Sequence, residues 1–337
     1  MLQYIVKRLI LSVFTLLVIM FASYCMLRLA PGSDAAVRSN FMENSSAGVS
    51  SAEKNEYAEN ESLKRKLKLD RSITVGFAEW LSDIILRGDF GESATVQPGK
   101  PVLEMISERL PVTIKLNLLA ITAAYIAAII IGVYSARYAE SFFDRFSSVI
   151  LFLLYSLPAM WVAMLLQSTF CEGGVFEIFP LTGFYEPTAE VGTFKAMAME
   201  LYYFTLPAVC LAYGSMTSLA RYTRSNMLDV LNSDFIRSAR AKGVSEAKIL
   251  WKHAFANTLI TLVTLFAGLL PSLIAGSIII EHIFNIPGMG TLSLLALSSR
   301  DYPLLMVLFA FSGALTLLGI LLSDILYTIV DPRVRLN

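Results

Sequence analysis

Six apolar runs, each about as long as a helix that crosses a lipid bilayer, constrain this chain more than any other feature of its sequence. A transmembrane helix requires about 20 consecutive, predominantly apolar residues. The six runs are Leu9–Leu27, Leu116–Tyr134, Val149–Phe170, Tyr202–Ala220, Thr258–Ile280 and Leu304–Leu322. They predict an all-α polytopic membrane protein with six transmembrane helices.

The composition favours the same class. Only 16% of the 337 residues are charged and 55% are hydrophobic, whereas a soluble domain carries about 25% charged residues. The first run follows Lys7 and Arg8, as the apolar part of a signal peptide would. It is longer than the roughly 7–15 apolar residues of a signal peptide, and no small-x-small cleavage site follows it. We therefore expect it to remain in the protein as the first span.

The distribution of Lys and Arg predicts the side of the membrane on which each loop lies, because cytoplasmic loops carry an excess of these residues. Four segments on one side together hold 13 of them, whereas the short loops 171–201 and 281–303 on the other side hold only Lys195 and Arg300. The four basic segments are 1–8, 135–148, 221–257 and 331–337. Both termini are therefore expected in the cytoplasm, and the long segment after the first span is expected outside.

Three regions follow from this topology. Residues 1–29 form the N-terminal tail and first transmembrane helix, residues 30–112 form an external segment, and residues 113–337 form a five-helix transmembrane core with the cytoplasmic loop 221–257. The external segment is expected to be partly flexible, because residues 40–62 are polar and low in large apolar side chains. Its stretch Ser72–Leu86 has apolar residues at helical spacing and is expected to pack on the outer face of the membrane domain.

The sequence offers no set of residues for enzymatic chemistry. His253 and His282 are the only histidines, and neither His-Glu-x-x-His nor Gly-x-Ser-x-Gly occurs. Gly99-Lys100 does not belong to a phosphate-binding loop, because the flanking positions that such a loop requires hold Ala94 and Pro101. Three widely spaced cysteines have no metal-ligand spacing. We therefore predict a chain that is not an enzyme, that hydrolyses no nucleotide and that binds neither a metal nor a cofactor.

The apolar runs contain one acidic residue and three prolines that bear on function. The last run is expected to continue toward Val330, so that Asp324 is the only acidic residue within a run. Its place close to the cytoplasmic interface favours a structural role over a functional one. Pro158, Pro207 and Pro271 fall inside the third, fourth and fifth runs, where proline removes a backbone hydrogen bond and kinks a helix. Kinked spans suit a pathway that opens and closes.

The cytoplasmic loop 221–257 is the most basic of the loops, and its sequence predicts two short helices. The first helix extends from Ser233 to Lys242, with Asp234 at its positive N-terminal end. Gly243 ends it, as glycine commonly does just past the last helical turn. Ala239 and Gly243, four residues apart, are expected to leave a flat patch that another surface can approach closely.

The second helix of the loop begins at Ser245, a suitable N-cap, and has Glu246 in its first turn. An apolar stripe is predicted along it at helical spacing. The stripe consists of Ala247, Leu250, Trp251, Ala254 and Phe255.

From these residues alone, two interpretations of the helix pair remain open. A basic helix beside a membrane can rest on anionic lipid headgroups. Alternatively, the pair is a docking element for a cytoplasmic protein and transmits force to the flanking spans. Binding of nucleic acid is discounted, because it would require a broader basic field.

The segment "SNMLDVLNSDFIRSARAKGVSEAKILWKHAFANTLIT" resembles the cytoplasmic loop of the permease subunits of ABC importers, in the dipeptide/oligopeptide/nickel class. The run Ala239-Arg240-Ala241-Lys242-Gly243 is similar to that class throughout, although Arg237 stands where the general family signature has Glu. Thr261 stands where the class often has Pro. Further segments resemble the class in the same order along the chain. They are "YIVKRLI…LRLAPGSD", "RGDFGES", "PVLEMISERLPVTIKLNL", "FPLTGF", "EHIFNIPGMGTL", "SRDYPLL" and "SDILYTIVDPRVR".

The resemblance implies the partners and the mechanism. It implies a multi-pass protein of the bacterial cytoplasmic membrane that pairs with a second, homologous permease subunit and forms half of the translocation pathway. Cytoplasmic ABC ATPase subunits would hydrolyse ATP, an external solute-binding protein would deliver the solute, and membrane lipid would surround the spans. The residues implied in the ATPase-coupling loop are Arg237, Ala239, Arg240, Ala241, Lys242, Gly243, Ser245 and Glu246.

The transported solute and one other function class remain open at this stage. Peptides are the solute that the class favours, with nickel, glutathione and sugars as alternatives. A self-sufficient channel or secondary transporter is the competing function, and it would call for a coupling-ion site at mid-membrane. Apart from Asp324, the six runs offer no acidic residue for such a site.

Overall fold

The computed structural model describes residues 2–29, 72–186, 192–269 and 272–330. The predicted flexible insert at 40–62 and the C-terminal tail at 331–337 lie outside these ranges. Within them the regular secondary structure is helical, and the only β pairing is the isolated bridges Glu92–Pro101 and Cys171–Phe179. The expectation of an all-α membrane protein is therefore confirmed.

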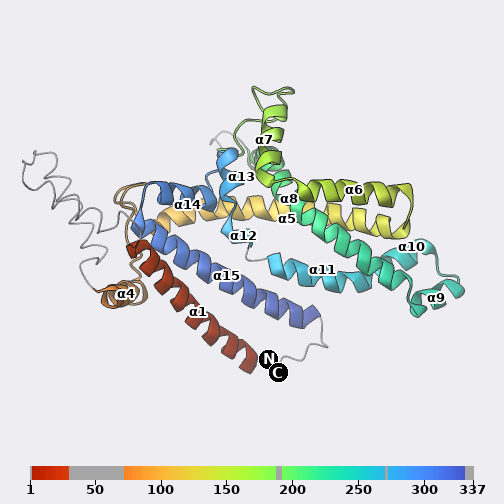
Figure 1. Cartoon of the computed structure of the whole chain (residues 1–337), viewed down its shortest axis with the longest axis horizontal. Helices are drawn as coiled ribbons and strands as arrows, with labels where there is room; N and C mark the ends of the chain where they lie inside the picture. Colours follow the sequence, from red (N-terminus) through yellow and green to blue (C-terminus); the bar gives the residue numbers. More distant parts are fainter. Residues whose placement is uncertain (1, 30–71, 187–191, 270–271, 331–337) are drawn as a thin grey trace, which may run out of the picture. The chain divides into compact units, whose positions relative to one another are not determined.

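The helices of the first half of the chain begin with three elements that precede the long second span. They are α1 (Leu2–Leu29), α4 (Ile73–Ser82) and the π-helical turn η1 (Asp83–Arg87). The next four, drawn in yellow and green in Figure 1, are α5 (Val102–Arg137), α6 (Phe142–Ser156), α7 (Ala159–Phe170) and α8 (Thr193–Leu231).

The second half of the chain contains shorter helices followed by one long one. The short helices after α8 are α9 (Asp234–Ala241), α10 (Glu246–Lys248), the π-helical turn η2 (Ile249–Ala254) and α11 (Phe255–Leu269). The chain continues through α12 (Ser272–Ala275), α13 (Ile278–Ile283), α14 (Met289–Ser298) and the long α15 (Tyr302–Val330).

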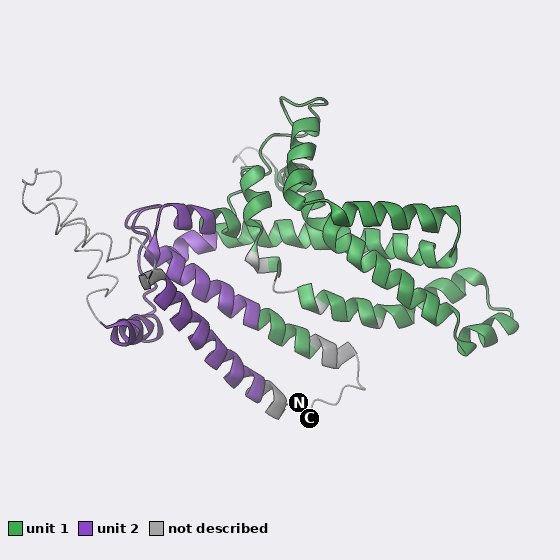
Figure 2. Cartoon of the chain, in the orientation of Figure 1, with its two compact units in different colours: residues 1, 109–292, 318–337 green, residues 2–108, 293–317 purple. Residues whose placement is uncertain are grey.

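The chain divides into two compact units, which Figure 2 shows in green and purple. The first unit comprises residues 109–292 and 318–337, and the second comprises residues 2–108 and 293–317. The loop that carries the predicted site lies entirely in the first unit. Each unit is described by itself below.

In the described part of the chain, four helices contain stretches long and apolar enough to cross a membrane, namely α1, α5, α8 and α15. Helices α6 and α7 would make a fifth span if they are counted together. The predicted fifth run, Thr258–Ile280, is not one continuous helix in the described residues. Helix α11 ends at Leu269, and the chain between α12 and α13 passes through Gly276 at a φ of +69°. Such a left-handed backbone conformation interrupts a right-handed helix.

The predicted kink at Pro158 is a break, since α6 and α7 meet there at 100°. Leu157 is extended, with φ −84° and ψ 130°, because the ring of a proline disfavours helical backbone at the residue before it. The carbonyl of Leu157 accepts a hydrogen bond of 2.8 Å from the Tyr213 hydroxyl of α8. In contrast, α8 continues through Pro207 without interruption.

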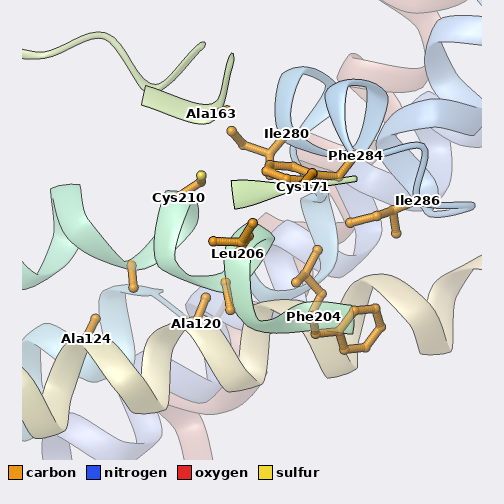
Figure 3. Packing of buried hydrophobic residues seen from close by; sticks show 13 residues of the cluster. Ala120, Ala124, Ala163, Cys171, Phe204, Leu206, Cys210, Ile280, Phe284 and Ile286 are labelled. Atoms are coloured by element: carbon orange, nitrogen blue, oxygen red, sulfur yellow. The ribbon is translucent and has the colours of Figure 1, made fainter. Parts of the chain in front are cut away.

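The core of the first unit is an apolar cluster where α5, α7, α8 and α13 meet, and Figure 3 shows its side chains. Small residues of α5, including Ala120 and Ala124, allow α8 to approach closely. Helix α13 contributes Ile280, and Phe284 follows directly after it. The cluster thus ties the interrupted fifth run to the long helices.

In the second unit, the predicted helix within Ser72–Leu86 is confirmed as α4 and η1. It packs on α1 through aromatic rings. The ring of Phe77 lies 5.2 Å from that of Phe21 and 5.7 Å from that of Tyr24, both edge to face. Edge-to-face geometry is favourable between aromatic quadrupoles.

Candidate functional site

The eight residues predicted for the coupling loop lie together on a short helix pair at the end of α8 (Figure 1). Four belong to α9, two lie in the turn after it, and Ser245 and Glu246 begin the second helix. All except Ala239 are exposed. The predicted helix boundaries agree with the observed ones to within one residue at each end of α9.

The turn at Gly243 is a Schellman motif, in which the last helical carbonyls accept bonds from the residues that follow. The Gly243 N–H donates to the Arg240 carbonyl at 2.9 Å, and the Val244 N–H donates to the Ala239 carbonyl at 3.2 Å. Gly243 has a φ of +75°, and no atom lies within 4 Å of the position that a Cβ would occupy there. Glycine is therefore favoured by backbone conformation, and the space beside it is open.

An ion pair crosses this turn and joins the two helices. The Arg240 guanidinium donates to the Glu246 carboxylate at 2.9 Å from Nε and 3.4 Å from Nη2. The hydrogen bond from Arg240 lowers the pKa of Glu246 below its ordinary value of 4.5. Because both side chains are about half exposed, solvent screens the pair, and it orients the helices more than it stabilises them.

The helix pair is held to the ends of α5 and α8 by a buried apolar group that we call the anchoring cluster. It consists of Val133, Ala136, Met227, Ile236, Ile249, Leu250 and Ala254. Ile236 is the buried residue of α9, and Ala239 and Val244 pack beside it. The expected flat patch was therefore wrong for Ala239, which faces the anchoring cluster rather than open space.

The predicted stripe of the second helix is correct in part. Leu250 and Ala254 are buried, but Trp251 is 41% exposed and Ala247 is exposed as well. Ile249, which lies outside the predicted stripe, is 0% exposed. The reason is that η2 is π-helical, and its wider turn aligns residues five apart, such as Ile249 and Ala254.

Ser245 occupies the N-cap position, as predicted, with extended backbone at φ −62° and ψ 144°. Its side chain makes no capping hydrogen bond. Ser233 occupies the corresponding position before α9, and its hydroxyl donates to the Val230 carbonyl instead of capping the helix. The N-terminal ends of α9 and α10 are therefore fixed by packing and by the turn between the helices rather than by serine caps.

The exposed face of the helix pair combines an aromatic ring with cations. Phe235 is 48% exposed, although it is adjacent to the buried Ile236. Arg237, at the place of the signature Glu, is exposed and lies 3.6 Å from Asp234. The described residues contain no cluster of three metal-ligating side chains. The arrangement is suited to docking a protein surface.

Sequence reasoning missed a buried carboxylate, Glu281, because the predicted fifth run stopped one residue before it. Glu281 is 1% exposed and accepts hydrogen bonds from the Thr113 hydroxyl at 3.1 Å and the Thr291 N–H at 3.0 Å. Thr113 in turn accepts from the Met289 N–H at 2.8 Å. Side chains of α5 and α13 thus cap the first turn of α14, where helical N–H groups lack partners.

Three glycines make room for this carboxylate, and they are the signal that could have revealed it. A Cβ added at any of them would come within 2.8 Å of a Glu281 carboxylate oxygen. They are Gly276, Gly288 and Gly290. An acidic residue that directly follows an apolar run and is flanked by such glycines indicates a buried carboxylate that accepts hydrogen bonds from its surroundings.

The second unit also contains a buried carboxylate that accepts several hydrogen bonds, that of Asp301, which is 0% exposed. Its carboxylate accepts a 2.6 Å bond from the Ser93 hydroxyl and backbone bonds from residues 94, 95 and 96 at 3.0–3.2 Å. Burial of the carboxyl opposes its ionisation, but these hydrogen bonds outweigh burial and lower its pKa. Asp301 therefore fastens the loop before α5 to the start of α15.

Asp324, the acid that the sequence singled out, lies in α15 one residue before the end of the apolar stretch Tyr302–Ile325. It is half-buried. This position agrees with the expected place near the end of the span.

Known proteins are similar to this chain over almost its whole length. Residues 128–336 match the family described as binding-protein-dependent transport system inner membrane component, and residues 1–117 match the N-terminal region of such membrane components. The chain is 36% identical over 335 residues to the oligopeptide transport system permease protein AppB of Bacillus subtilis, covering 99% of this chain and 100% of that protein.

Two further relatives agree with this match. A putative peptide transport system permease protein of Brucella abortus is 35% identical over 333 residues, which is 98% of each chain. The oligopeptide transport system permease protein OppB of Mycobacterium tuberculosis is 35% identical over 276 residues, covering 80% of this chain and 83% of that protein.

Proposed function

Since the chain belongs to the family of binding-protein-dependent transport system inner membrane components, and is thus a permease subunit of an ABC importer, we propose that its α9–α10 helix pair couples ATP hydrolysis to transport. In this function an ATPase partner grips the exposed face of the pair. Nucleotide binding and hydrolysis in the partner shift the pair and, with it, the membrane helices. This chain itself binds no nucleotide and has no catalytic role.

The observation that carries this proposal is the two-sided character of the helix pair. Its outer face is exposed and carries Phe235, Arg237 and Arg240, whereas its inner face places Ile236 in the anchoring cluster. A force on the outer face is therefore passed to the ends of α5 and α8. A helix that merely rests on lipid headgroups would direct its apolar face to the bilayer and not to the protein.

The complete importer contains several subunits. Two permease subunits, this chain and a homologue, enclose the pathway, two cytoplasmic ABC ATPases occupy the helix pairs, and a solute-binding protein delivers the solute from outside. This chain has six spans, with the interrupted segment of α11 to α13 as the fifth, and both termini in the cytoplasm. The Lys and Arg distribution supports this orientation in the bacterial inner membrane.

Peptides are the proposed solute. The relatives described above carry the names of oligopeptide or peptide transport permeases. The apolar runs of this chain offer no charged pair that would select the two ends of one particular peptide. Selectivity is accordingly assigned to the binding protein, and the pathway accepts peptides of varied sequence.

Purification with native partners tests this function. A tagged chain is expected to recover an ATPase that carries Gly-x-x-x-x-Gly-Lys-Ser/Thr, and proteoliposomes with the binding protein are expected to take up labelled oligopeptide only with ATP. Recovery of a lone homo-oligomer with ATP-independent flux would support a channel or secondary transporter and refute the proposal.

Gly243 provides the test of the coupling role. Gly243→Trp should assemble in the membrane but lose coupling, so that ATP is hydrolysed with little uptake, because a bulky side chain intrudes on the docking face. Gly243→Asn is the matched control, since asparagine tolerates a positive φ and adds little bulk. Normal uptake by stably expressed Gly243→Trp would contradict the coupling role of this turn.

A further inference from the structure

A bidentate ion pair joins the beginning of α6 to the last turns of α8. The Arg224 guanidinium donates to the Asp144 carboxylate through Nε at 2.6 Å and through Nη2 at 2.7 Å, one bond to each carboxylate oxygen. The Asp144 side chain is 3% exposed and that of Arg224 is 34% exposed. Two parallel bonds of this kind fix orientation as well as distance.

The carboxylate of Asp144 also organises the start of its own helix. It accepts a 2.9 Å hydrogen bond from the Glu140 N–H in the turn before α6. Ser141 caps α6 by accepting from the Asp144 N–H at 3.3 Å. One turn later, the hydroxyls of Ser147 and Ser135 lie 2.9 Å apart and connect α6 to α5. The beginning of α6 is thus held on both sides.

The ion pair is adjacent to the anchoring cluster of the helix pair. Met227, three residues beyond Arg224 in α8, is 0% exposed within that cluster. Thr223, on the other side of Arg224, lies where α8 crosses α5, and a Cβ on Gly132 would come within 2.5 Å of its side chain. The ends of α5 and α8 are therefore closely packed against each other, and α9 packs on them through the anchoring cluster.

Helix α6 differs from these elements because its remaining side chains are largely exposed. Phe142, Phe146 and Phe152 are between 53% and 83% exposed, whereas Leu151 is 5% exposed in a cluster with residues of α5, α8 and α11. Beyond α6 the chain turns by 100° into α7, which contributes Ala163 to the core shown in Figure 3. Helix α6 is also joined to α8 by Leu151 in its middle and by the Tyr213–Leu157 hydrogen bond at its end. The ion pair is the bidentate contact, and it fixes the orientation of α6 at its beginning.

We propose that Asp144 and Arg224 are positioning residues that make α6 follow the α9–α10 helix pair, so that a displacement imposed by the ATPase reaches the bend at Pro158. This inference rests on the proposed function of the helix pair. It adds α6 to the helices that move with the pair, which are α5 and α8 in the proposed function. The pair is partly buried, and loss of one partner leaves the other charge without its counter-ion.

Transport per ATP hydrolysed is the readout that separates this role from a purely structural one. In the assembled importer, Asp144→Asn and Arg224→Gln are each expected to lower the ratio of peptide uptake to ATP hydrolysis about tenfold. Subunit composition and basal ATPase activity are expected to persist. The double variant should be no worse than the more affected single variant, because both remove the same interaction. Arg224→Lys keeps the positive charge but cannot make the two parallel hydrogen bonds of the guanidinium. Its ratio of uptake to ATP hydrolysis should lie between those of the wild type and Arg224→Gln.

Arg145→Gln is the matched control, since it removes an exposed cation beside Asp144 that does not donate to it. It should retain the wild-type ratio. Ratios within twofold of wild type for Asp144→Asn would overturn the proposal, as would losses in the two single variants that add in the double variant.

A distance measurement tests the same proposal independently of the uptake assay. Spin labels at Phe142→Cys in α6 and Ser238→Cys in α9, both exposed, are introduced after replacement of the three native cysteines by alanine. The distance between them should stay constant when ATP binds to the wild-type complex, and its distribution should broaden with Asp144→Asn. A distance that changes in the wild-type complex, or that is insensitive to Asp144→Asn, would refute joint movement.

Failure of the proposed function gives a different result. A wild-type complex without ATP-dependent uptake would refute the function, while the label distance would still report whether α6 and α9 move as one body. A wild-type complex that transports normally, with variants that keep their coupling ratio, would refute only the role of the ion pair.

Discussion

A single exposed ion pair between Arg240 and Glu246 joins α9 to the beginning of α10. The hydrogen bond from Arg240 holds the pKa of Glu246 below its ordinary value of 4.5. The ionised form of Glu246 is therefore more favoured in the folded protein than in the unfolded chain, and the ion pair contributes to the stability of the fold. Its contribution is fully present above the ordinary pKa and is lost as the pH falls through the lower, folded-state pKa.

Arg240→Gln is accordingly expected to return the pKa of Glu246 toward 4.5. The measurement is a titration of the labelled Glu246 carboxyl carbon by NMR in detergent. Lys242→Gln, which removes a neighbouring cation that makes no bond to Glu246, should leave the titration close to that of the wild type. An unchanged pKa in Arg240→Gln would show that the pair does not form in solution.

The space around Glu281 makes a second prediction at the level of one residue. Alanine at position 290 would place its Cβ 2.7 Å from the Ile278 nitrogen and 2.8 Å from the Glu281 carboxylate. Gly290→Ala should destabilise the protein by about 1–3 kcal/mol, the usual cost of overpacking a filled site.

Thermal unfolding of the purified protein in detergent measures this effect. Gly268→Ala is the matched control, because no atom lies within 4 Å of its added Cβ and its backbone is helical. Equal stability of the two variants would contradict the close packing around Glu281.

At the scale of one helix, α9 has two neighbouring residues with opposite environments. Ile236 is 0% exposed in the anchoring cluster, whereas Phe235 is 48% exposed. Ile236→Ala should loosen the helix pair and cost about 2–5 kcal/mol, as truncations of buried aliphatic side chains do. Phe235→Ala should leave the fold intact and weaken ATPase docking.

Hydrogen exchange of the peptide that covers α9, measured alongside binding of the purified ATPase, separates the two effects. Faster exchange in Ile236→Ala together with wild-type exchange in Phe235→Ala is expected. Reversal of this order would mean that α9 presents its other face to the partner.

The elements of this chain differ in how far they follow from sequence. Helix α9 was predictable because Asp234 and Gly243 mark its two ends, and α4 was predictable from its apolar spacing. The π-helical turn η2 was not, because a pattern of apolar residues at spacings of three and four does not reveal that one turn holds an extra residue. The break at Pro158 was expected as a kink, but its angle depends on packing that sequence alone does not contain.

The helix pair of the candidate site was predictable as a segment but not in its contacts. The loop residues follow from basic character, the Gly243 break and the family resemblance. The Arg224–Asp144 pair joins residues 80 positions apart, and the Glu281 contacts with Thr113 join residues 168 positions apart. Such pairings depend on which helices lie side by side, and six apolar runs are compatible with many arrangements.

For the whole molecule, the proposed orientation predicts which positions are accessible from each side of the membrane. Gln97→Cys, in the loop that Asp301 fastens, should react with an impermeant maleimide added to intact cells. Ser238→Cys, in the exposed part of α9, should react only after permeabilisation. The variants require a background without the native cysteines Cys25, Cys171 and Cys210. Labelling of Ser238→Cys in intact cells would invert the topology.

The bend at Pro158 also has a consequence for the lipid in which the importer works. Helix α6 has 15 residues before the chain turns, which corresponds to about 22 Å of helix along its axis. The hydrocarbon core of a typical bilayer is about 30 Å thick. This segment alone is therefore too short for the core, and the bilayer beside α6 must thin or the neighbouring protein must cover the difference. A subunit with such a local mismatch would make acyl-chain length a determinant of how readily the importer changes state.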